Sequence, residues 1–247
     1  MKNKVDAKGN IISFPSMAKP NIEDIFAEFL ADQKRRLKPQ TFRRYEEVIS
    51  LFHTSLNLYG YQELPTAGEN TLYRRLADYK DQTFCVIFGP EKIPSGVSTF
   101  LTFFMIRKVM ASESLLRAAG TVTKALMKWL VSKGYAPKEE ARKAMELASE
   151  ASRELPAAER LARLLYDFSQ THPPRTWHDE LDDYFVVEEI RPGVLVLSGV
   201  TMETGPLEVK VPRIITDHCK VGWQINLLLG ETRSGWRILE SGNVYPL

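Results

Sequence analysis

Cysteine is scarce in this chain, and long apolar runs are absent. Its 247 residues include two cysteines, Cys85 and Cys219, which lie far apart and form no Cys-x-x-Cys motif. This argues against a disulfide scaffold or a zinc site and fits a reducing compartment, so we expect a cytoplasmic protein. No apolar run approaches the roughly 20 residues of a membrane-spanning helix, and the basic N-terminus lacks the apolar core of a secretory signal. We therefore expect no membrane partner.

Histidine is also rare, and the common catalytic motifs are missing. The four histidines have no metal-ligand spacing, and the sequence holds no glycine-rich phosphate loop, His-Glu-x-x-His or Gly-x-Ser-x-Gly motif. Asp182 and Asp183 could serve as a pair of catalytic carboxylates, but such a cluster is more commonly an acidic linker. We expect no metal, no cofactor and no enzymatic activity.

Charge is distributed unevenly along the chain. Residues 1–135 carry 20 lysines and arginines against 13 aspartates and glutamates, whereas residues 136–247 carry 13 against 18. A basic first half and an acidic second half indicate different tasks, with chance scatter as the alternative.

Apolar residues recur at helical spacing through the first half. Asn21 precedes one such stripe, and Pro39 and Thr41 open a second helix with an apolar repeat that begins at Phe42. Further helices are predicted at residues 72–79, 98–108 and 114–133, the last ending at Gly134. The run 84–88 is too short to distinguish a strand from a helix. The first 20 residues lack periodicity and are predicted to be a flexible tail.

Two segments resemble the core-binding (SAM-like) N-terminal domain of tyrosine recombinases and phage integrases. Residues 37–52, which begin Leu-Lys-Pro-Gln-Thr-Phe-Arg-Arg-Tyr, resemble the second helix of that domain, and residues 129–135 resemble the end of its last helix. The resemblance implies a helical bundle that grips duplex DNA. Residues 138–247 are too short for the catalytic domain of the family. Tyr245, which lies near the C-terminus as the nucleophile of the family does, is interpreted as a structural aromatic.

The arginines near the start of the second helix favour an anionic partner. The helix dipole places partial positive charge at this end, so Arg43 and Arg44 cost stability unless an anion offsets them. Double-stranded DNA is the partner that the resemblance implies. The residues expected to contact it are Lys38, Thr41, Arg43, Arg44, Arg74, Arg75, Lys124 and Lys128. The alternative is that these charges form the solvated faces of amphipathic helices.

The second half changes from helical to strand-like periodicity. Residues 138–171 are predicted to form two helices split at Leu155–Pro156, followed by an acidic link at 179–183. Strands are predicted at 184–190, 194–199, 207–211, 223–230 and 236–240, with room for a short helix after the third. They indicate a small barrel, OB-like or SH3-like. Residues 184–247 hold six lysines and arginines against seven acids, so we expect this barrel to bind a protein partner or a second copy rather than nucleic acid.

The predicted fold class is multidomain α and β. It combines an N-terminal all-α SAM-like helical bundle, a helical connector and a C-terminal five-stranded β-barrel. The expected domains are a tail at 1–20, a core-binding-like domain at 21–137, a connector at 138–178 and a barrel at 179–247. The expected function is non-catalytic DNA binding of the kind used in DNA integration and recombination. The alternative is a protein–protein adaptor that reuses the helical fold without binding nucleic acid.

Overall fold

The computed structural model describes residues 17–80, 82–202 and 204–246. The chain divides into two compact units: the first comprises the segments up to residue 96 and 126–142, and the second comprises 97–125 and 143–247. The division cuts through two long helices, and the predicted domain boundaries at 137 and 178 stay a prediction. Most of the predicted tail, residues 1–16, lies outside the described residues.

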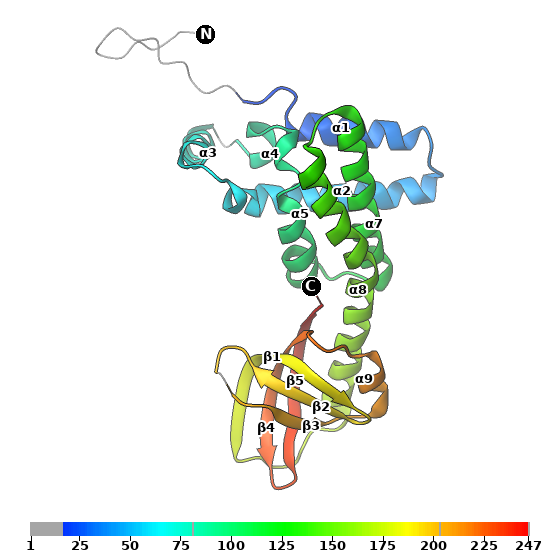
Figure 1. Cartoon of the computed structure of the whole chain (residues 1–247), viewed down its shortest axis with the longest axis vertical. Helices are drawn as coiled ribbons and strands as arrows, with labels where there is room; N and C mark the ends of the chain where they lie inside the picture. Colours follow the sequence, from blue (N-terminus) through cyan, green and yellow to red (C-terminus); the bar gives the residue numbers. More distant parts are fainter. Residues whose placement is uncertain (1–16, 81, 203, 247) are drawn as a thin grey trace, which may run out of the picture. The chain divides into compact units, whose positions relative to one another are not determined.

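The first unit is helical throughout its described part. Its elements are α1 (Ile22–Lys34), α2 (Pro39–Tyr59), η1 (Gly60–Glu63), α3 (Ala67–Lys80), α4 (Phe84–Ile87), η2 (Pro90–Lys92) and the C-terminal end of α7 (Glu113–Lys133). Helices α1 and α2 form an antiparallel hairpin (Figure 1). Ile22, Phe29 and Phe52 are fully buried in its core. The short run at 84–88 is helical, with Phe84 and Ile87 buried.

Local sequence signals set the ends of these helices. The Asn21 side chain accepts a hydrogen bond from the Asp24 amide at 2.9 Å, and Asp24 accepts from the Asn21 amide at 3.1 Å, so α1 begins with a capping box. Gly134 follows α7 with a φ of 76°, and the Tyr135 amide donates to the Leu130 carbonyl at 2.9 Å. This is the Schellman arrangement, which needs a left-handed residue where a side chain would be strained. Both predicted helix ends are confirmed.

The second unit begins with a helical segment that contains a π-helical stretch. Helix α5 (Gly96–Ser98) continues as the π-helix η3 (Thr99–Phe104) and then as α6 (Met105–Arg107). The helix predicted here is confirmed, but its π-helical stretch has no sequence signal. Phe100, Leu101 and Phe104 of this stretch are buried.

The prediction of two helices split at Leu155–Pro156 is wrong. Helix α8 runs unbroken from Lys138 to Thr171, with Pro156 inside it. A proline in this position removes one backbone hydrogen bond and usually kinks or ends a helix. Leu155, Ala158 and Leu161 are buried around the proline, and their packing offsets the lost bond.

Five strands and a short helix complete the second unit. They are β1 (Asp179–Arg191), β2 (Val194–Gly199), β3 (Leu207–Lys210), α9 (Arg213–His218), β4 (Gln224–Thr232) and β5 (Gly235–Tyr245). The order of paired strands is β1-β2-β3-β5-β4, and β4 pairs with β1 again. All pairs are antiparallel except β3 with β5, which share a single registered pair, Val209 and Trp236, so the sheet is joined weakly there. The expected five-stranded sheet is confirmed, as is the short helix after the third strand.

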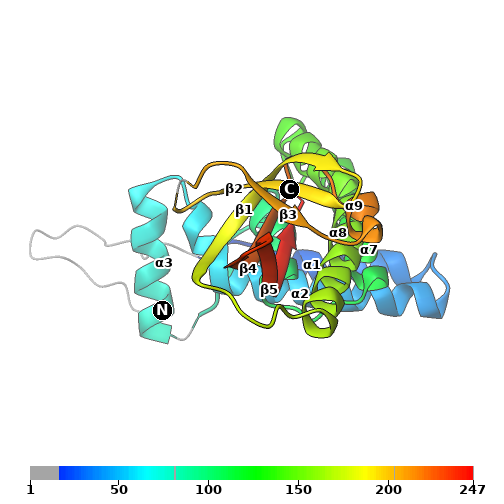
Figure 2. The ribbon, with the colours of Figure 1, turned by 90° about the horizontal axis from the view of Figure 1, so that it is seen from below.

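The core of the sheet is shared with two helices that lie beside it (Figure 2). Phe185, Leu197 and Ile225 point into this core, together with Leu161 of α8 and Ile215 of α9. The alternation of buried and exposed residues along the strands explains why the strands were predictable.

Residues 179–183 are not the acidic link that was predicted, because they form the start of β1. Leu181 packs against the core of the sheet, while Asp182 is exposed. The Asp183 carboxylate is 4% exposed and accepts hydrogen bonds from the amides of Tyr184, Thr201 and Met202 at 2.7, 2.9 and 3.0 Å. Burial alone would raise its pKa, but these bonds lower it overall. Asp183 therefore fixes the loop after β2.

The helices and the two cysteines can also be compared with the expectations from the sequence. In the described part of the chain, no helix has the length and apolar character needed to cross a membrane. Cys85 and Cys219 are free and buried, and burial raises the pKa of the Cys219 thiol to about 12.

Gly120 lies where α7 meets α8, and we expect its replacement to destabilise the second unit. A Cβ atom at this position would lie 2.5 Å from both the Ala148 carbonyl oxygen and the Ser152 amide nitrogen. Backbone atoms cannot move aside, so Gly120→Ala should lower the free energy of unfolding by about 1–3 kcal/mol in urea denaturation. Gly205→Ala is the control, since its Cβ would meet nothing within 4 Å. Equal effects of the two changes would contradict the close approach of the two helices.

Candidate nucleic-acid interface

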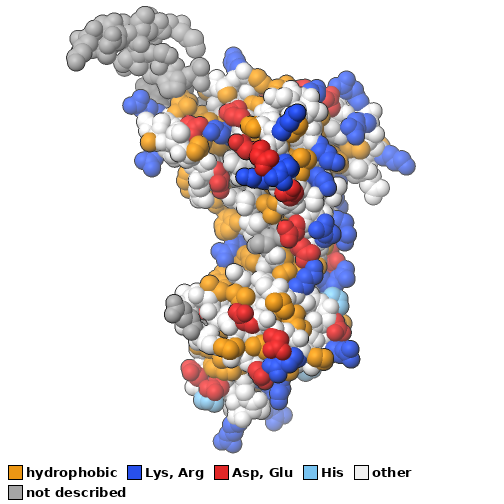
Figure 3. Space-filling view, in the orientation of Figure 1, with side chains coloured by type: hydrophobic (Ala, Val, Ile, Leu, Met, Phe, Trp, Pro, Cys, Tyr) orange, Lys and Arg blue, Asp and Glu red, His pale blue; other side chains and the backbone are white. Residues whose placement is uncertain are grey.

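The connection between α1 and α2 carries a dense group of cations. We call residues 34–44 the hairpin tip; they include Lys34, Arg35, Arg36, Lys38, Arg43 and Arg44. Figure 3 shows lysine and arginine side chains gathered at this end of the hairpin. Because a turn of few residues joins the two helices, cations close in sequence must also lie close in space.

Three cations of the hairpin tip have partners within the first unit. Arg35 pairs with Asp32 at 2.5 Å, and Arg44 pairs with Glu47 at 2.6 Å. The Lys34 ammonium lies 5.9 Å from the centre of the Phe42 ring. The carboxylates of Asp32 and Glu47 partly neutralise Arg35 and Arg44, whereas the Phe42 ring leaves the charge of Lys34 in place.

The other three cations of the tip, Arg36, Lys38 and Arg43, are exposed. None of them forms an ion pair within the residues that the structure describes. Lys38 is also the residue before α2, which has Pro39 in its first turn, no acidic residue there and no side-chain cap. Amide donors at an uncapped helix start attract anions. The tip therefore combines exposed cations that have no ion-pair partner with an electropositive helix end.

The predicted DNA-contacting residues fall into separate groups. Lys38, Thr41, Arg43 and Arg44 lie together at the start of α2, and Thr41 is exposed like its neighbours. Arg74 and Arg75 are exposed on α3, beyond the other end of α2 (Figure 1). The 21 residues of α2 separate the two groups by about 30 Å at 1.5 Å per residue. Lys124 and Lys128 lie on α7, the first half-buried and the second exposed.

Arg36 was not among the predicted contacts. Cations near the C-terminal end of a helix are favourable without any ligand, so the position of Arg36 in the sequence does not by itself indicate a binding role. In the structure it lies just after α1, and Arg35 occupies the C-cap position instead. The density of basic residues from 34 to 44 was the signal that could have identified it.

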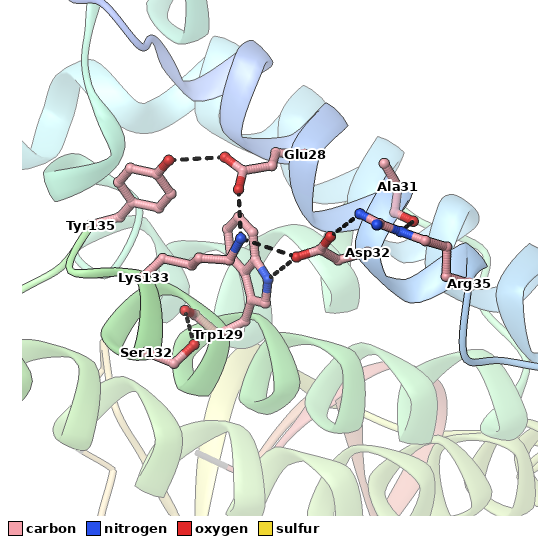
Figure 4. A network of polar contacts seen from close by, with 8 residues as sticks. All are labelled: Glu28, Ala31, Asp32, Arg35, Trp129, Ser132, Lys133 and Tyr135. Atoms are coloured by element: carbon pink, nitrogen blue, oxygen red, sulfur yellow. Dashed lines mark hydrogen bonds and ion pairs between the residues drawn. The ribbon is translucent and has the colours of Figure 1, made fainter.

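A polar network fixes the C-terminal half of α1 to the end of α7 (Figure 4). The Trp129 indole donates to Asp32 at 2.9 Å, and the Lys133 ammonium bonds Glu28 at 2.8 Å and Asp32 at 3.2 Å. The Tyr135 hydroxyl donates to Glu28 at 2.9 Å. The bond from Lys133 lowers the pKa of Glu28, and the bond from Trp129 lowers that of Asp32. Both α1 carboxylates are thus engaged by donors of α7 and Tyr135, and Asp32 also pairs with Arg35 of the hairpin tip.

The structure also shows the surroundings of Tyr245 and of His172. Tyr245 accepts a hydrogen bond from Arg107 at 2.5 Å, within an aromatic cluster. One His-x-x-Arg spacing occurs, at His172 and Arg175. The His172 ring stacks on Phe168 and bonds its neighbour Thr171, so its contacts are local. Within the described residues, no three histidine, cysteine or acidic side chains form a group that could hold a metal ion.

Comparisons with protein-family models, with curated proteins and with solved structures found no match to this chain.

Acid should weaken the first unit through Glu28 and Asp32. Because their pKa values lie below the ordinary 4.5 and 3.8, their contribution is present above those values and is lost as the pH falls through the lowered ones. We expect the Glu28→Gln/Asp32→Asn variant to unfold at lower urea concentration than the wild type at pH 7. The difference should shrink as the pH falls from 4.5 to 3, with unfolding followed by far-UV circular dichroism.

The matched control for this titration is Glu46→Gln. Glu46 is an exposed carboxylate on α2 and forms no ion pair within the described residues. Its replacement should leave the urea midpoint and its pH dependence close to those of the wild type. If the urea midpoints of Glu28→Gln/Asp32→Asn and of the wild type differ by the same amount at every pH, the lowered pKa values do not contribute to stability.

Proposed function

We propose that this chain is a non-catalytic protein that binds double-stranded DNA through the hairpin tip. The observation that carries the proposal is the group of three exposed cations, Arg36, Lys38 and Arg43, beside the uncapped start of α2. Cations that neutralise phosphates release counterions from DNA, which supplies a large part of binding free energy. The amides at the helix start add donors for the same oxygens.

The resemblance to the recombinase core-binding domain also supports DNA binding by the hairpin tip. The matching segment Leu-Lys-Pro-Gln-Thr-Phe-Arg-Arg-Tyr forms the turn and the first helical residues of α2. Its Lys38, Thr41 and Arg43 face solvent, while Phe42 is buried. This division leaves the polar part of the motif free for a ligand and uses its apolar part for the fold.

For the sheet we propose the OB-like arrangement rather than the SH3-like one. Its support is the strand order β1-β2-β3-β5-β4 together with α9 between β3 and β4. An OB-fold is a five-stranded, partly open barrel, and the single pair between β3 and β5 is the open point here.

The adaptor function remains the second candidate, and one observation favours it. The loop after β2 exposes Val200 and Met202, at 47% and 52%, while Asp183 holds its backbone. Apolar side chains exposed to solvent on a backbone held by hydrogen bonds are suited to contact another protein. A failure to bind DNA would direct attention to this loop.

DNA binding can be tested by fluorescence anisotropy with a labelled 30-base-pair duplex, titrated at several salt concentrations. We expect Arg36→Ala/Lys38→Ala/Arg43→Ala to weaken binding strongly. The slope of log affinity against log salt should fall by about 0.9 for each phosphate that the variant no longer neutralises. Arg44→Ala alone should have a smaller effect, because Arg44 is already paired with Glu47.

Two further variants test which cations contribute to DNA binding. Lys143→Ala/Lys210→Ala removes two exposed lysines outside the first unit, and it controls for a general loss of charge. Arg74→Ala/Arg75→Ala tests whether α3 takes part. If the hairpin variant binds like the lysine control, or the wild type does not bind at low salt, the proposal is wrong.

A further inference from the structure

A second group of cationic and aromatic side chains lies in the second unit, where α6 ends near the last strand. The Arg107 Nε donates to the Tyr245 hydroxyl at 2.5 Å, and its Nη2 donates to the Tyr184 hydroxyl at 2.7 Å. The guanidinium also lies 5.1 to 5.6 Å from the ring centres of Tyr245, Tyr184 and Phe103. The Lys108 ammonium lies 5.7 Å from the Phe103 ring. We call these five residues the Arg107 cluster.

The positive charge of this cluster is not neutralised by a carboxylate. Arg107 and Lys108 are both exposed, and neither forms an ion pair among the described residues. The adjacent carboxylate on β1, that of Asp183, is buried and bonded to three backbone amides. Asp182 is exposed on the same strand and forms no bond to Arg107. Two cations therefore remain available to solvent.

The two hydroxyls of the cluster are left with protons to donate. Each phenol oxygen accepts a hydrogen bond from Arg107, and that of Tyr245 also accepts from Asn243 at 3.3 Å. Among the described residues, neither hydroxyl donates to another group. The cluster thus offers two hydroxyl donors, the guanidinium and an ammonium. Several free donors together with positive charge match an oxyanion.

We propose that the Arg107 cluster binds a phosphate group of a nucleic-acid strand, at a site separate from the hairpin tip. A phosphate has several acceptor oxygens and can take bonds from arginine, lysine and both hydroxyls together. The rings of Phe103, Tyr184 and Tyr245 are partly exposed, and aromatic rings beside cations are typical of surfaces that hold single strands by stacking. A single strand and a duplex both present phosphates. Binding experiments with each can show which of the two the site holds.

A purely structural clamp between α6 and the sheet predicts different behaviour. Such a clamp needs Arg107 and the phenol oxygens, but it has no use for Lys108, whose ammonium has only a ring beside it. It also has no use for the protons of the two hydroxyls. Lys108→Ala therefore distinguishes a binding site from a clamp. Tyr184→Phe/Tyr245→Phe removes the oxygens together with the protons, so its binding is interpreted alongside its thermal stability.

The test uses the full chain, with anisotropy titrations of a labelled 20-nucleotide oligo(dT) and a labelled 30-base-pair duplex. Lys108→Ala should weaken binding about fivefold near 0.1 M salt and reduce the salt slope by about 0.7 on the single strand, or about 0.9 on the duplex. Tyr184→Phe/Tyr245→Phe should weaken binding about tenfold. The matched controls are Lys210→Ala, an exposed lysine on β3, and Tyr166→Phe, a tyrosine on α8 that is 55% exposed.

The outcomes separate the two sites. Loss of affinity in the cluster variants, but not in the controls, supports the phosphate site. The oligonucleotide that shows the loss identifies whether the site binds a single strand or a duplex. If both cluster variants bind both oligonucleotides as their controls do, the proposal is overturned. Should the double phenylalanine variant be unstable in thermal unfolding, Lys108→Ala decides alone. The hairpin-tip variant, titrated in parallel, shows whether the proposed function fails independently.

Discussion

The contact of Trp129 with α1 is the interaction on which the first unit depends. Its indole meets the Phe29 ring edge to face, with centres 5.4 Å apart, and donates a hydrogen bond to Asp32. Trp129 is 8% exposed, so its N–H needs this partner to avoid the cost of an unsatisfied buried donor. One side chain thereby joins the apolar core to the polar network and holds the end of α7 against the hairpin.

This anchoring has an electrostatic consequence for the hairpin tip. Asp32 accepts bonds from Trp129 and Lys133 as well as from Arg35, so its charge is shared among three donors. Glu28 is similarly engaged with Lys133 and Tyr135. These two acids of α1 are therefore occupied, while Arg36, Lys38 and Arg43 of the hairpin tip have no ion-pair partner among the described residues. The fold itself separates positive from negative charge within the first unit.

Features set by neighbouring residues could be predicted from the sequence. The cap at Asn21, the stop at Gly134 and the alternation in the strands all depend on residues within a few positions. The unbroken α8 and the strand at 179–183 could not, because packing across α8 overrides Pro156 and pairing with β4 turns an acidic segment into β1. The same limit applies to the sites. The positions of Lys38 and Arg43 at a helix start could be predicted from the local sequence. The contacts of Lys133 and Arg107 could not, because their partners lie 105 and 138 residues away.

The acidic character of the second half does not by itself exclude contact with nucleic acid. Residues 136–247 carry 13 lysines and arginines against 18 acids, which at low salt would repel a phosphate backbone. At physiological ionic strength, however, charges beyond about 8 Å are largely screened. What a phosphate then experiences is its immediate surroundings, and at the Arg107 cluster these are two cations and two hydroxyl donors. The two cations of the proposed site, Arg107 and Lys108, belong to the basic residues 1–135, and residues 136–247 contribute the hydroxyls of Tyr184 and Tyr245. The acidic average of the second half is therefore compatible with the proposed phosphate site, because donors from both halves converge there.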